Sequence, residues 1–214
     1  MGGHAYRETK KGKQMKKIMF NDKFLLTKAV LVGTKTITRR IVDVPTECVF
    51  KTLTDCHGNK VHAVGYDEKP VFRWETRYQI GEVVAIAQPY KTLYPNADFE
   101  MEDSYHFLTE SKGWNNKMFV KADLMPHHIK ITDVRVERLQ DITDEDCLKE
   151  GIMDFIPSDD EYMVERCGYF TSDGGCFLFD TPREAYASLI NKICGKDTWQ
   201  RNPWMEVYTF ERVD

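Results

Sequence analysis

The chain has 214 residues, of which 42% are hydrophobic and 30% are charged, and it carries a formal net charge of −4 at pH 7. This length suits one soluble domain with a substantial core. The acidic balance argues against broad, nonspecific binding of nucleic acid, which requires an excess of Lys and Arg, but it allows a local basic groove.

The first 17 residues form a basic tail. Six Lys or Arg residues stand against Glu8 there, a net charge of +5, so residues 18–214 carry −9. The tail lacks the apolar stretch of a secretory signal, and all apolar runs are far shorter than the roughly 20 residues of a membrane span. We therefore predict a cytoplasmic protein without membrane segments. Residues 1–17 are expected to be a disordered extension, or a weak tether for polyanions, and residues 18–214 a single domain.

The first predicted element is a helix over residues 22–32. Asn21 or Asp22 is placed to cap it, and Gly33 to end it in the left-handed conformation. Apolar residues recur along it at helical spacing, at Phe24, Leu25, Ala29 and Val32. The stretch TKTITRRIV after Gly33 alternates, which is typical of a strand or an extended edge.

The middle of the chain predicts strands and one insertion. Residues 45–76 contain CVFKTLT and KVHAVG around the turn CHGN, which predicts a hairpin insertion. GEVVAIAQ is a short, wholly apolar strand, whereas the polar and aromatic mixture of residues 94–118 favours a loop. HIKITDVRVERL alternates as a strand, but its apolar phase slips by one residue. A bulge near Thr132 and Asp133 would explain that slip.

Two capped helices are predicted in the second half. In ITDEDCLKEGI, Thr143 is the cap, three acids occupy the first turn, and Gly151 ends the helix. In TPREAYASLINKICG, Thr181 and Glu184 form a capping box, and Gly195 ends the helix. The apolar stripe expected to be buried in this second helix consists of Tyr186, Leu189, Ile190 and Ile193.

A second insertion lies between these helices, over residues 153–180. ERCGYFTSDGGCFLFD predicts a hairpin that turns at Asp173 and Gly174. Its register places Cys167 and Cys176 out of reach of each other, so no disulfide is expected across it. The six cysteines include no CxxC pair, and the six histidines include one adjacent pair. We therefore expect reduced thiols and no metal site.

The chain ends in the strand-like run PWMEVYTFERV, and no internal repeat or low-complexity linker divides residues 18–214. The elements together predict the α+β class. We expect a small mixed or antiparallel β-barrel, flanked by about three helices and interrupted by the two hairpin insertions.

Lys35 and Thr38 are the first candidates for chemistry. Three residues apart after a helix end, they converge if the chain bends between them, and a lysine beside a hydroxyl can activate that hydroxyl as a nucleophile. The lysine must be neutral to accept a proton, and Arg39 and Arg40 would lower its pKa by like-charge repulsion. The alternative interpretation is a solvated turn of Lys and Arg, with Thr38 filling a strand.

Glu150 is the second candidate, as the last helical residue before Gly151. The negative end of a helix dipole disfavours the charged carboxylate, which suits a group that holds a proton part of the time. The alternative is an exposed glutamate in a charged helix. Other side chains could contact a ligand, although such residues more often serve the core or the surface: Gln88, Lys121, Trp199 and Trp204.

Four blocks, taken in chain order, resemble one known family. They are GTKTITRR after an N-terminal helix, YQIGEVVAIAQ, ITDVRVERLQDITDEDCLKEGI and TPREAYASLINKICGKDTWQRNPWMEVYTFE. Together they resemble the ASCH domain family, especially its longer members from phages, prophages and bacteria. The resemblance covers most of residues 18–214, apart from the two insertions. It implies a PUA-like β-barrel that binds RNA in a cleft beside the first helix.

A small bacterial branch of this family is an amidohydrolase that removes the acetyl group from N4-acetylcytidine. Its catalytic Lys and Thr share the KxxT spacing of Lys35 and Thr38, its following arginine matches Arg40, and its glutamate aligns with Glu150. The resemblance implies Lys35 as base, Thr38 as nucleophile and Glu150 as proton donor, without a cofactor. Further contacts to RNA or to a modified nucleoside are expected from Gly33, Arg39, Arg40, Gln88, Lys121 and Trp204.

The chain also departs from the longer members of the family. Glu82 stands where they usually have Asp, and Gln88 where they have Glu. Gln88 can hydrogen-bond a base edge but cannot act as an acid or base. Three functions therefore remain open: a nucleoside amidohydrolase, a non-catalytic RNA-binding module, and a phage accessory protein that contacts other proteins through the two insertions.

Overall fold

The computed structural model describes residues 15–45, 47–54, 60–66, 69–95, 110–155, 168–171 and 178–214. Several predicted features lie outside this part of the chain: residues 1–14 of the tail, the CHGN turn, most of the 94–118 loop, the turn at Asp173 and Gly174, and Cys56, Cys167 and Cys176. None of the helices in the described ranges is long and apolar enough to span a bilayer.

The described elements are five helices, three short 3-10 helices and ten strands. The helices are α1 (Leu26–Leu31), α2 (Tyr90–Leu93), α5 (Asp144–Lys149), α6 (Pro182–Cys194) and α7 (Thr198–Arg201). The 3-10 helices are η1 (Lys117–Phe119), η2 (Ala122–Leu124) and η3 (Leu139–Asp141). The strands are β1 (Lys17–Ile18), β2 (Ile37–Ile41), β3 (Val49–Thr54), β4 (Lys60–Tyr66), β5 (Lys69–Trp74), β6 (Val83–Ile86), β7 (His128–Arg138), β8 (Ile152–Phe155), β9 (Gly168–Thr171) and β10 (Trp204–Arg212).

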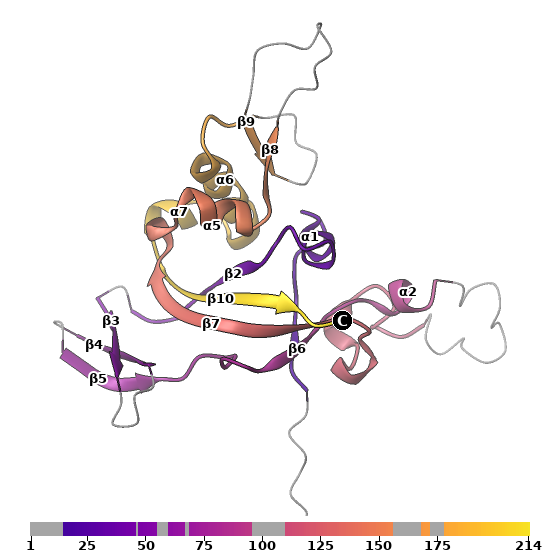
Figure 1. The fold of residues 1–214 in the computed structure, drawn as a ribbon, viewed down its shortest axis with the longest axis horizontal. Coiled ribbons are helices and arrows are strands. Elements are labelled where there is room, and N and C mark those ends of the chain that lie inside the picture. Colours follow the sequence, from indigo (N-terminus) through magenta and orange to yellow (C-terminus); the bar gives the residue numbers. More distant parts are fainter. Residues whose placement is uncertain are drawn as a thin grey trace, which may run out of the picture.

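A five-stranded sheet forms the centre of the molecule, in the order β1-β6-β7-β10-β2 (Figure 1). Only the β1–β6 pair in it is parallel. The α+β class with mostly antiparallel strands is therefore confirmed. Among the described strands, β1 and β2 remain the two edges of this sheet. The predicted closure into a barrel is not confirmed.

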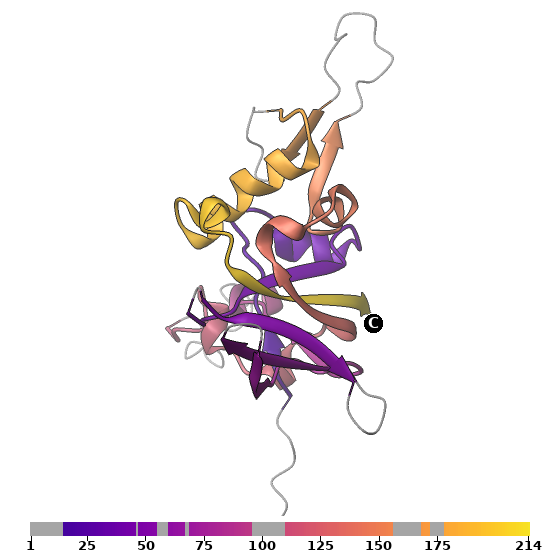
Figure 2. The same ribbon diagram turned by 90° about the vertical axis from the view of Figure 1, so that its left-hand side faces the viewer.

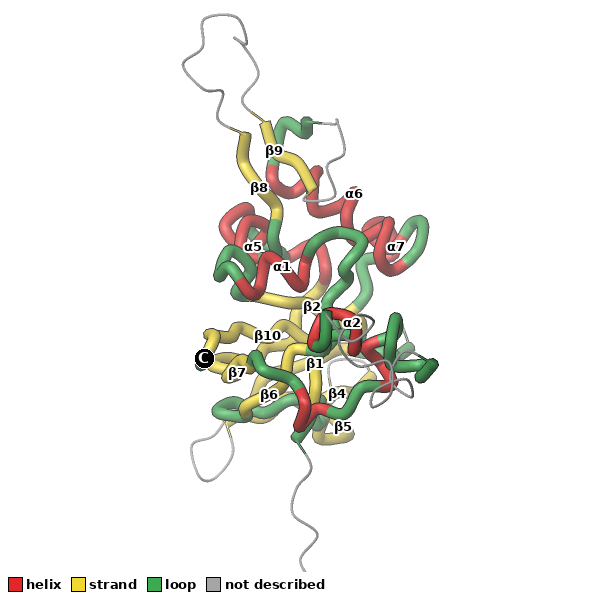
Figure 3. The backbone as a smooth tube through the Cα atoms, turned by 90° about the vertical axis from the view of Figure 1, so that its right-hand side faces the viewer, coloured by secondary structure: helices red, strands yellow, loops and turns green. Residues whose placement is uncertain are grey.

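The two sides of the central sheet carry different layers. Helices α1, α5, α6 and α7 lie over one side together with β8 and β9, and the sheet of β3, β4 and β5 lies on the other (Figures 1 and 2). Figure 3 shows the same separation from the opposite direction. The main core joins the helical layer to the sheet, because one cluster contains buried residues of both, among them Leu26, Val30, Ile37, Leu189, Ile190 and Val207.

Strand β7 contains the predicted bulge. Thr209 of β10 pairs with Asp133, but the next residue, Phe210, pairs with Ile131, so Thr132 is left without a partner. The extra residue restores the alternation: Ile131 before the bulge and Val134 after it are both buried. The phase slip in the sequence therefore predicted this feature correctly.

The first insertion has three strands rather than two. β4 pairs antiparallel with both β3 and β5, and β5 was not expected. Pro70 explains the omission, because a proline within an apolar run argues against a strand, yet a sheet edge tolerates it. The insertion packs on the central sheet through a second cluster, in which Phe50 contacts the rings of Trp74 and Trp204 at centroid distances of 5.5 and 5.2 Å.

The second insertion also gains a strand. The expected hairpin pairing exists as a bridge between Tyr169 and Phe179, one residue from the predicted register. The other edge of β9 pairs antiparallel with β8, which directly follows α5. The four residues of β8, IMDF, are too few and show no clear alternation of polar and apolar residues, so the sequence alone does not predict this strand.

The predicted helices are present, with one shifted start. α1 begins at Leu26 rather than residue 22, because Leu25 adopts φ 53°, and the Asn21 side chain accepts a hydrogen bond from Lys23 N in the preceding turn. Of the predicted apolar stripe, Phe24 and Ala29 are buried, whereas Leu25 and Val32 are exposed. The caps of the later helices are confirmed: the hydroxyls of Thr143 and Thr181 accept from backbone N–H groups of α5 and α6.

Candidate functional site

The segment that carries Lys35 is held between two helix ends. Gly33 has φ +83° and turns the chain out of α1. Lys35 N then donates to Ala29 O at 3.0 Å, and Thr36 N donates to Lys149 O at 2.9 Å. The first bond ties this segment to α1 and the second to α5. Lys35 is thereby placed next to Glu150, which terminates α5.

Lys35 and Glu150 form a buried ion pair. The Lys35 Nζ contacts Oε2 of the Glu150 carboxylate and donates to the Glu150 backbone oxygen at 2.8 Å. The two side chains are only 1% and 6% exposed. Gly151, with φ +102°, follows directly and allows the chain to leave the helix at this point. The alternative interpretations, a solvated turn for Lys35 and an exposed glutamate for Glu150, are therefore wrong.

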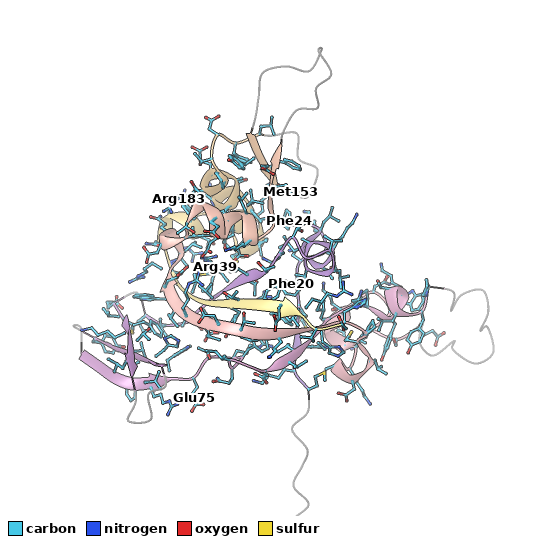
Figure 4. All side chains as sticks on the ribbon, viewed as in Figure 1. Phe20, Phe24, Arg39, Glu75, Met153 and Arg183 are labelled. Carbon is cyan, nitrogen blue, oxygen red and sulfur yellow. The ribbon has the colours of Figure 1, made fainter. Side chains whose placement is uncertain are left out.

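Arg39 holds the other oxygen of the same carboxylate. Its Nη1 lies 3.2 Å from Glu150 Oε1, and its Nη2 lies 2.7 Å from both Glu137 Oε1 and Asp146 Oδ2. The side chain is completely buried, and Figure 4 shows Arg39 between the central sheet and the helical layer. Arg135 extends this network, since its Nε donates to Glu137 at 2.8 Å and its Nη2 contacts Asp146. Arg39 thus serves first to fix the orientation of the Glu150 carboxylate.

A cavity of about 160 Å³ opens beside the ion pair. Polar residues reach it from β2 and the segment before it, and apolar residues reach it from α6. Its lining includes Phe20, Leu26, Lys35, Thr38, Arg39, Arg40, Ile41, Glu150, Tyr186, Leu189, Ile190 and Ile193. The cavity is therefore lined by all four residues that the sequence analysis placed in one site: Lys35, Thr38, Arg40 and Glu150.

The Thr38 side chain is available to a ligand. It is buried and lines the cavity, and its hydroxyl makes no hydrogen bond with the residues that the structure describes. Arg40 is partly exposed beside it, where Nη2 donates to Met19 O at 2.5 Å and the guanidinium lies 5.8 Å from the centre of the Phe20 ring. Arg40 therefore forms one side of the cavity while keeping its charge near solvent.

Burial lowers the pKa of Lys35 below its usual value of 10.5. The positive charges of Arg40 and Arg39 lower this pKa further, whereas the Glu150 carboxylate opposes the change. The proton of the Lys35–Glu150 pair is consequently held less firmly than on an exposed lysine.

The other predicted ligand contacts lie elsewhere. Gln88 is buried at a separate cavity of about 210 Å³ between α1 and α2, with its amide oxygen unpartnered. Lys121 is exposed at the start of η2. The Trp204 indole donates to Cys48 O at 2.7 Å beside the first insertion. Gly33 positions Lys35 through the backbone, and none of these four lines the Lys35 cavity.

The structure adds cavity residues that the sequence did not assign to the site, among them Phe20 and Tyr186. Phe20 lies with its ring centre 6.0 Å from Lys35 Nζ. Tyr186 was predicted only as part of the buried stripe of α6, yet it also lines the cavity. Helical spacing predicts burial but carries no information about what a buried hydroxyl faces.

Within the described ranges, no group of three or more His, Cys, Asp or Glu side chains is arranged to hold a metal ion. Cys48, Cys147 and Cys194 are free thiols. Burial raises the pKa of the Cys147 thiol to about 12, so this thiol is not a nucleophile at neutral pH.

No protein-family model, curated protein or solved structure matches this chain.

Proposed function

We propose that the protein is an ASCH-domain amidohydrolase of the cytoplasm that acts on an N-acylated nucleoside, free or within RNA. The observation that carries this proposal is the buried Lys35–Glu150 pair next to the unpartnered hydroxyl of Thr38. A base, a nucleophile and an acid thus share one small cavity. The order of the four sequence blocks supports the family assignment, and the PUA-like barrel belongs to the same proposal.

The proposed reaction uses Lys35, in its uncharged form, as the base and Glu150 as the proton donor. Thr38 Oγ attacks the amide carbonyl carbon, and its proton passes to Lys35 Nζ. Glu150 gives its proton to the leaving nitrogen as the C–N bond breaks. Water then attacks the acyl ester on Thr38 and gives a proton to Glu150. The C–Oγ bond breaks, Lys35 returns its proton to Thr38 Oγ, and the carboxylic acid is released. The net reaction consumes one water and yields an acid and the free exocyclic amine.

The cavity size restricts the substrate. A volume of about 160 Å³ is well below the roughly 300–1,000 Å³ of typical ligand pockets. It fits an acyl amide and part of one ring, while a sugar or a longer chain stays outside. The apolar side chains of Leu189, Ile190 and Ile193 on α6 suit the acyl group. Arg40 is placed to hold the part of the substrate that remains near solvent.

The test is hydrolysis of N4-acetylcytidine and a panel of other N-acylated nucleosides, followed by chromatography of the products. Thr38→Val is the critical variant, because it keeps the shape of the side chain and removes a hydroxyl that bonds to no described residue. We expect it to lose turnover by more than about 10³-fold while its urea midpoint stays unchanged. The matched control is Thr36→Val, a threonine outside the cavity lining, which should retain full activity.

Two results would contradict the proposal. Turnover that persists in Thr38→Val would remove Thr38 as nucleophile. Absence of turnover across the panel, combined with salt-dependent binding of RNA oligonucleotides that Arg40→Met weakens, would make the cavity a non-catalytic RNA site instead.

A further inference from the structure

Tyr186 is a second hydroxyl in the same cavity. It lies on α6, is only 2% exposed, and lines the cavity with Lys35 and Thr38. Its ring packs edge-on against Trp199, with the centroids 6.4 Å apart, and Ala185 and Leu189 beside it are fully buried. The ring is therefore fixed in one orientation, as a residue that positions a substrate atom must be.

The hydroxyl of Tyr186 has no hydrogen-bond partner among the residues that the structure describes. Two other buried tyrosines differ in this respect: Tyr78 donates to Lys17 O at 2.9 Å, and Tyr208 donates to the Glu206 carboxylate. Buried hydroxyl groups are nearly always hydrogen-bonded. The Tyr186 hydroxyl is not one of the fully buried atoms without a partner in the described ranges. It therefore borders the open space of the cavity, where a ligand can supply its partner.

The missing partner is an acceptor. Burial raises the pKa of Tyr186 well above its usual value, so the phenol keeps its proton. The neighbouring carboxylate of Glu150 is already engaged, with Oε1 held by Arg39 and Oε2 by Lys35. The Tyr186 O–H is thus free to donate to an oxygen or nitrogen lone pair of the ligand.

Other donors in the cavity are less suited to the reacting oxygen. The Nη groups of Arg39 are committed to three carboxylates, although its buried Nε has no partner among the described residues. Arg40 binds Met19 O near solvent. Lys35 has to be neutral in order to accept the proton of Thr38. Asn21 and Cys194 also line the cavity, but they lie nearer to solvent. Tyr186 is a neutral donor that is as deeply buried as Lys35, Thr38 and Glu150.

Building on the function proposed above, we infer that Tyr186 is a catalytic residue whose hydroxyl donates a hydrogen bond to the carbonyl oxygen of the scissile amide. When Thr38 Oγ bonds to the carbonyl carbon, the C=O electron pair moves onto this oxygen. Tyr186 stabilises the resulting oxyanion and keeps its own proton. The electron pair returns to re-form the carbonyl as the C–N bond breaks. A preorganised donor of this kind acts more strongly on the transition state than on the substrate.

The test compares Tyr186→Phe with Tyr78→Phe in the full chain, with kcat, KM and the urea midpoint measured for each. For Tyr186→Phe we expect kcat to fall by about 10²–10³-fold, with KM changed little and the midpoint unchanged, because no protein hydrogen bond is lost. For Tyr78→Phe we expect the reverse: a lower midpoint, because the bond to Lys17 O is lost, and an unchanged kcat.

The outcomes separate this inference from the proposal beneath it. If the wild type hydrolyses an acyl nucleoside and Tyr186→Phe does so equally well, Tyr186 is not the donor and the amidohydrolase proposal stands. A fall in the midpoint of Tyr186→Phe would equally overturn the inference, since it would reveal a structural partner. If the wild type hydrolyses none of the panel, both conclusions fail together.

Discussion

At the scale of single residues, the unusual feature is the burial of a lysine. An ammonium group taken out of water is stable only when opposite charge and hydrogen bonds replace its hydration. Glu150 supplies both through its carboxylate and its backbone oxygen, and Arg39 in turn holds that carboxylate. This arrangement costs folding free energy compared with an apolar packing of the same shape. A cost of this kind is typical of residues retained for function.

The lowered pKa of Lys35 makes the stability of the protein depend on pH. Consider pH values that lie above the lowered pKa of Lys35 in the folded state and below its usual pKa of 10.5. At such pH values the unfolded chain binds more protons than the native protein. Stability in this window therefore rises with pH. We predict that wild type gains stability relative to Lys35→Met as the pH is raised from neutrality toward 10.5. Urea unfolding of both proteins at a series of pH values measures this difference. If the free energies of unfolding of the two proteins change in parallel with pH, the pKa of Lys35 is not lowered in the folded state.

At the scale of elements, the site depends on where the helices α1 and α5 end. α5 ends at Glu150 because Gly151 turns the chain, and the segment between α1 and β2 bends because Gly33 leaves the helix with positive φ. Backbone hydrogen bonds from Lys35 and Thr36 then tie this segment to α1 and α5. The geometry of the proposed site is therefore set by helix termini, whose positions depend on a few cap residues.

Replacing Gly151 tests this dependence. Its φ of +102° is unfavourable for any residue with a Cβ, so Gly151→Ala should lower the free energy of unfolding by about 1–3 kcal/mol. It should also lower kcat, because relaxation of the strain moves Glu150. Gly195→Ala is the matched control: its φ is +104° with no atom within 4 Å of an added Cβ, and it ends α6 away from the ion pair. If Gly151→Ala and Gly195→Ala lose the same stability and keep the same activity, the proposed role of the α5 terminus is wrong.

At the scale of the whole molecule, the two sides of the central sheet have separate tasks. The helical layer closes the cavity, while the sheet of β3, β4 and β5 packs on the other side through Phe50, Trp74 and Trp204. A buried carboxylate, Glu206, joins this insertion to the central sheet, since it accepts from Trp74 Nε1 at 2.7 Å and from the Tyr208 hydroxyl. We expect the insertion to contribute stability rather than chemistry.

Trp74→Phe isolates this contribution. The ring packing is largely kept, but a buried oxygen of Glu206 loses its donor, so the free energy of unfolding should fall by about 1–3 kcal/mol with kcat unchanged. The control is Phe72→Leu, at an exposed position on the same strand. It should change the free energy of unfolding by less than about 0.5 kcal/mol. A marked loss of activity in Trp74→Phe would show that the insertion is coupled to the cavity.

Local signals in the sequence determined the α+β class, the caps of α5 and α6, the bulge in β7 and the grouping of Lys35, Thr38 and Glu150. Each of these depends on neighbouring residues, through spacing, capping or alternation, or on a family-like order of blocks. The tertiary structure alone decided that Lys35 and Glu150 are buried, that Arg39 fixes the carboxylate, and that Tyr186 faces the cavity while Gln88, Lys121 and Trp204 do not. It also decided the third strand of the first insertion and the open edges of the central sheet. These features depend on contacts between residues far apart in the chain, such as Lys35 and Glu150, which are 115 positions apart. No local pattern specifies which side chains will meet across such a separation.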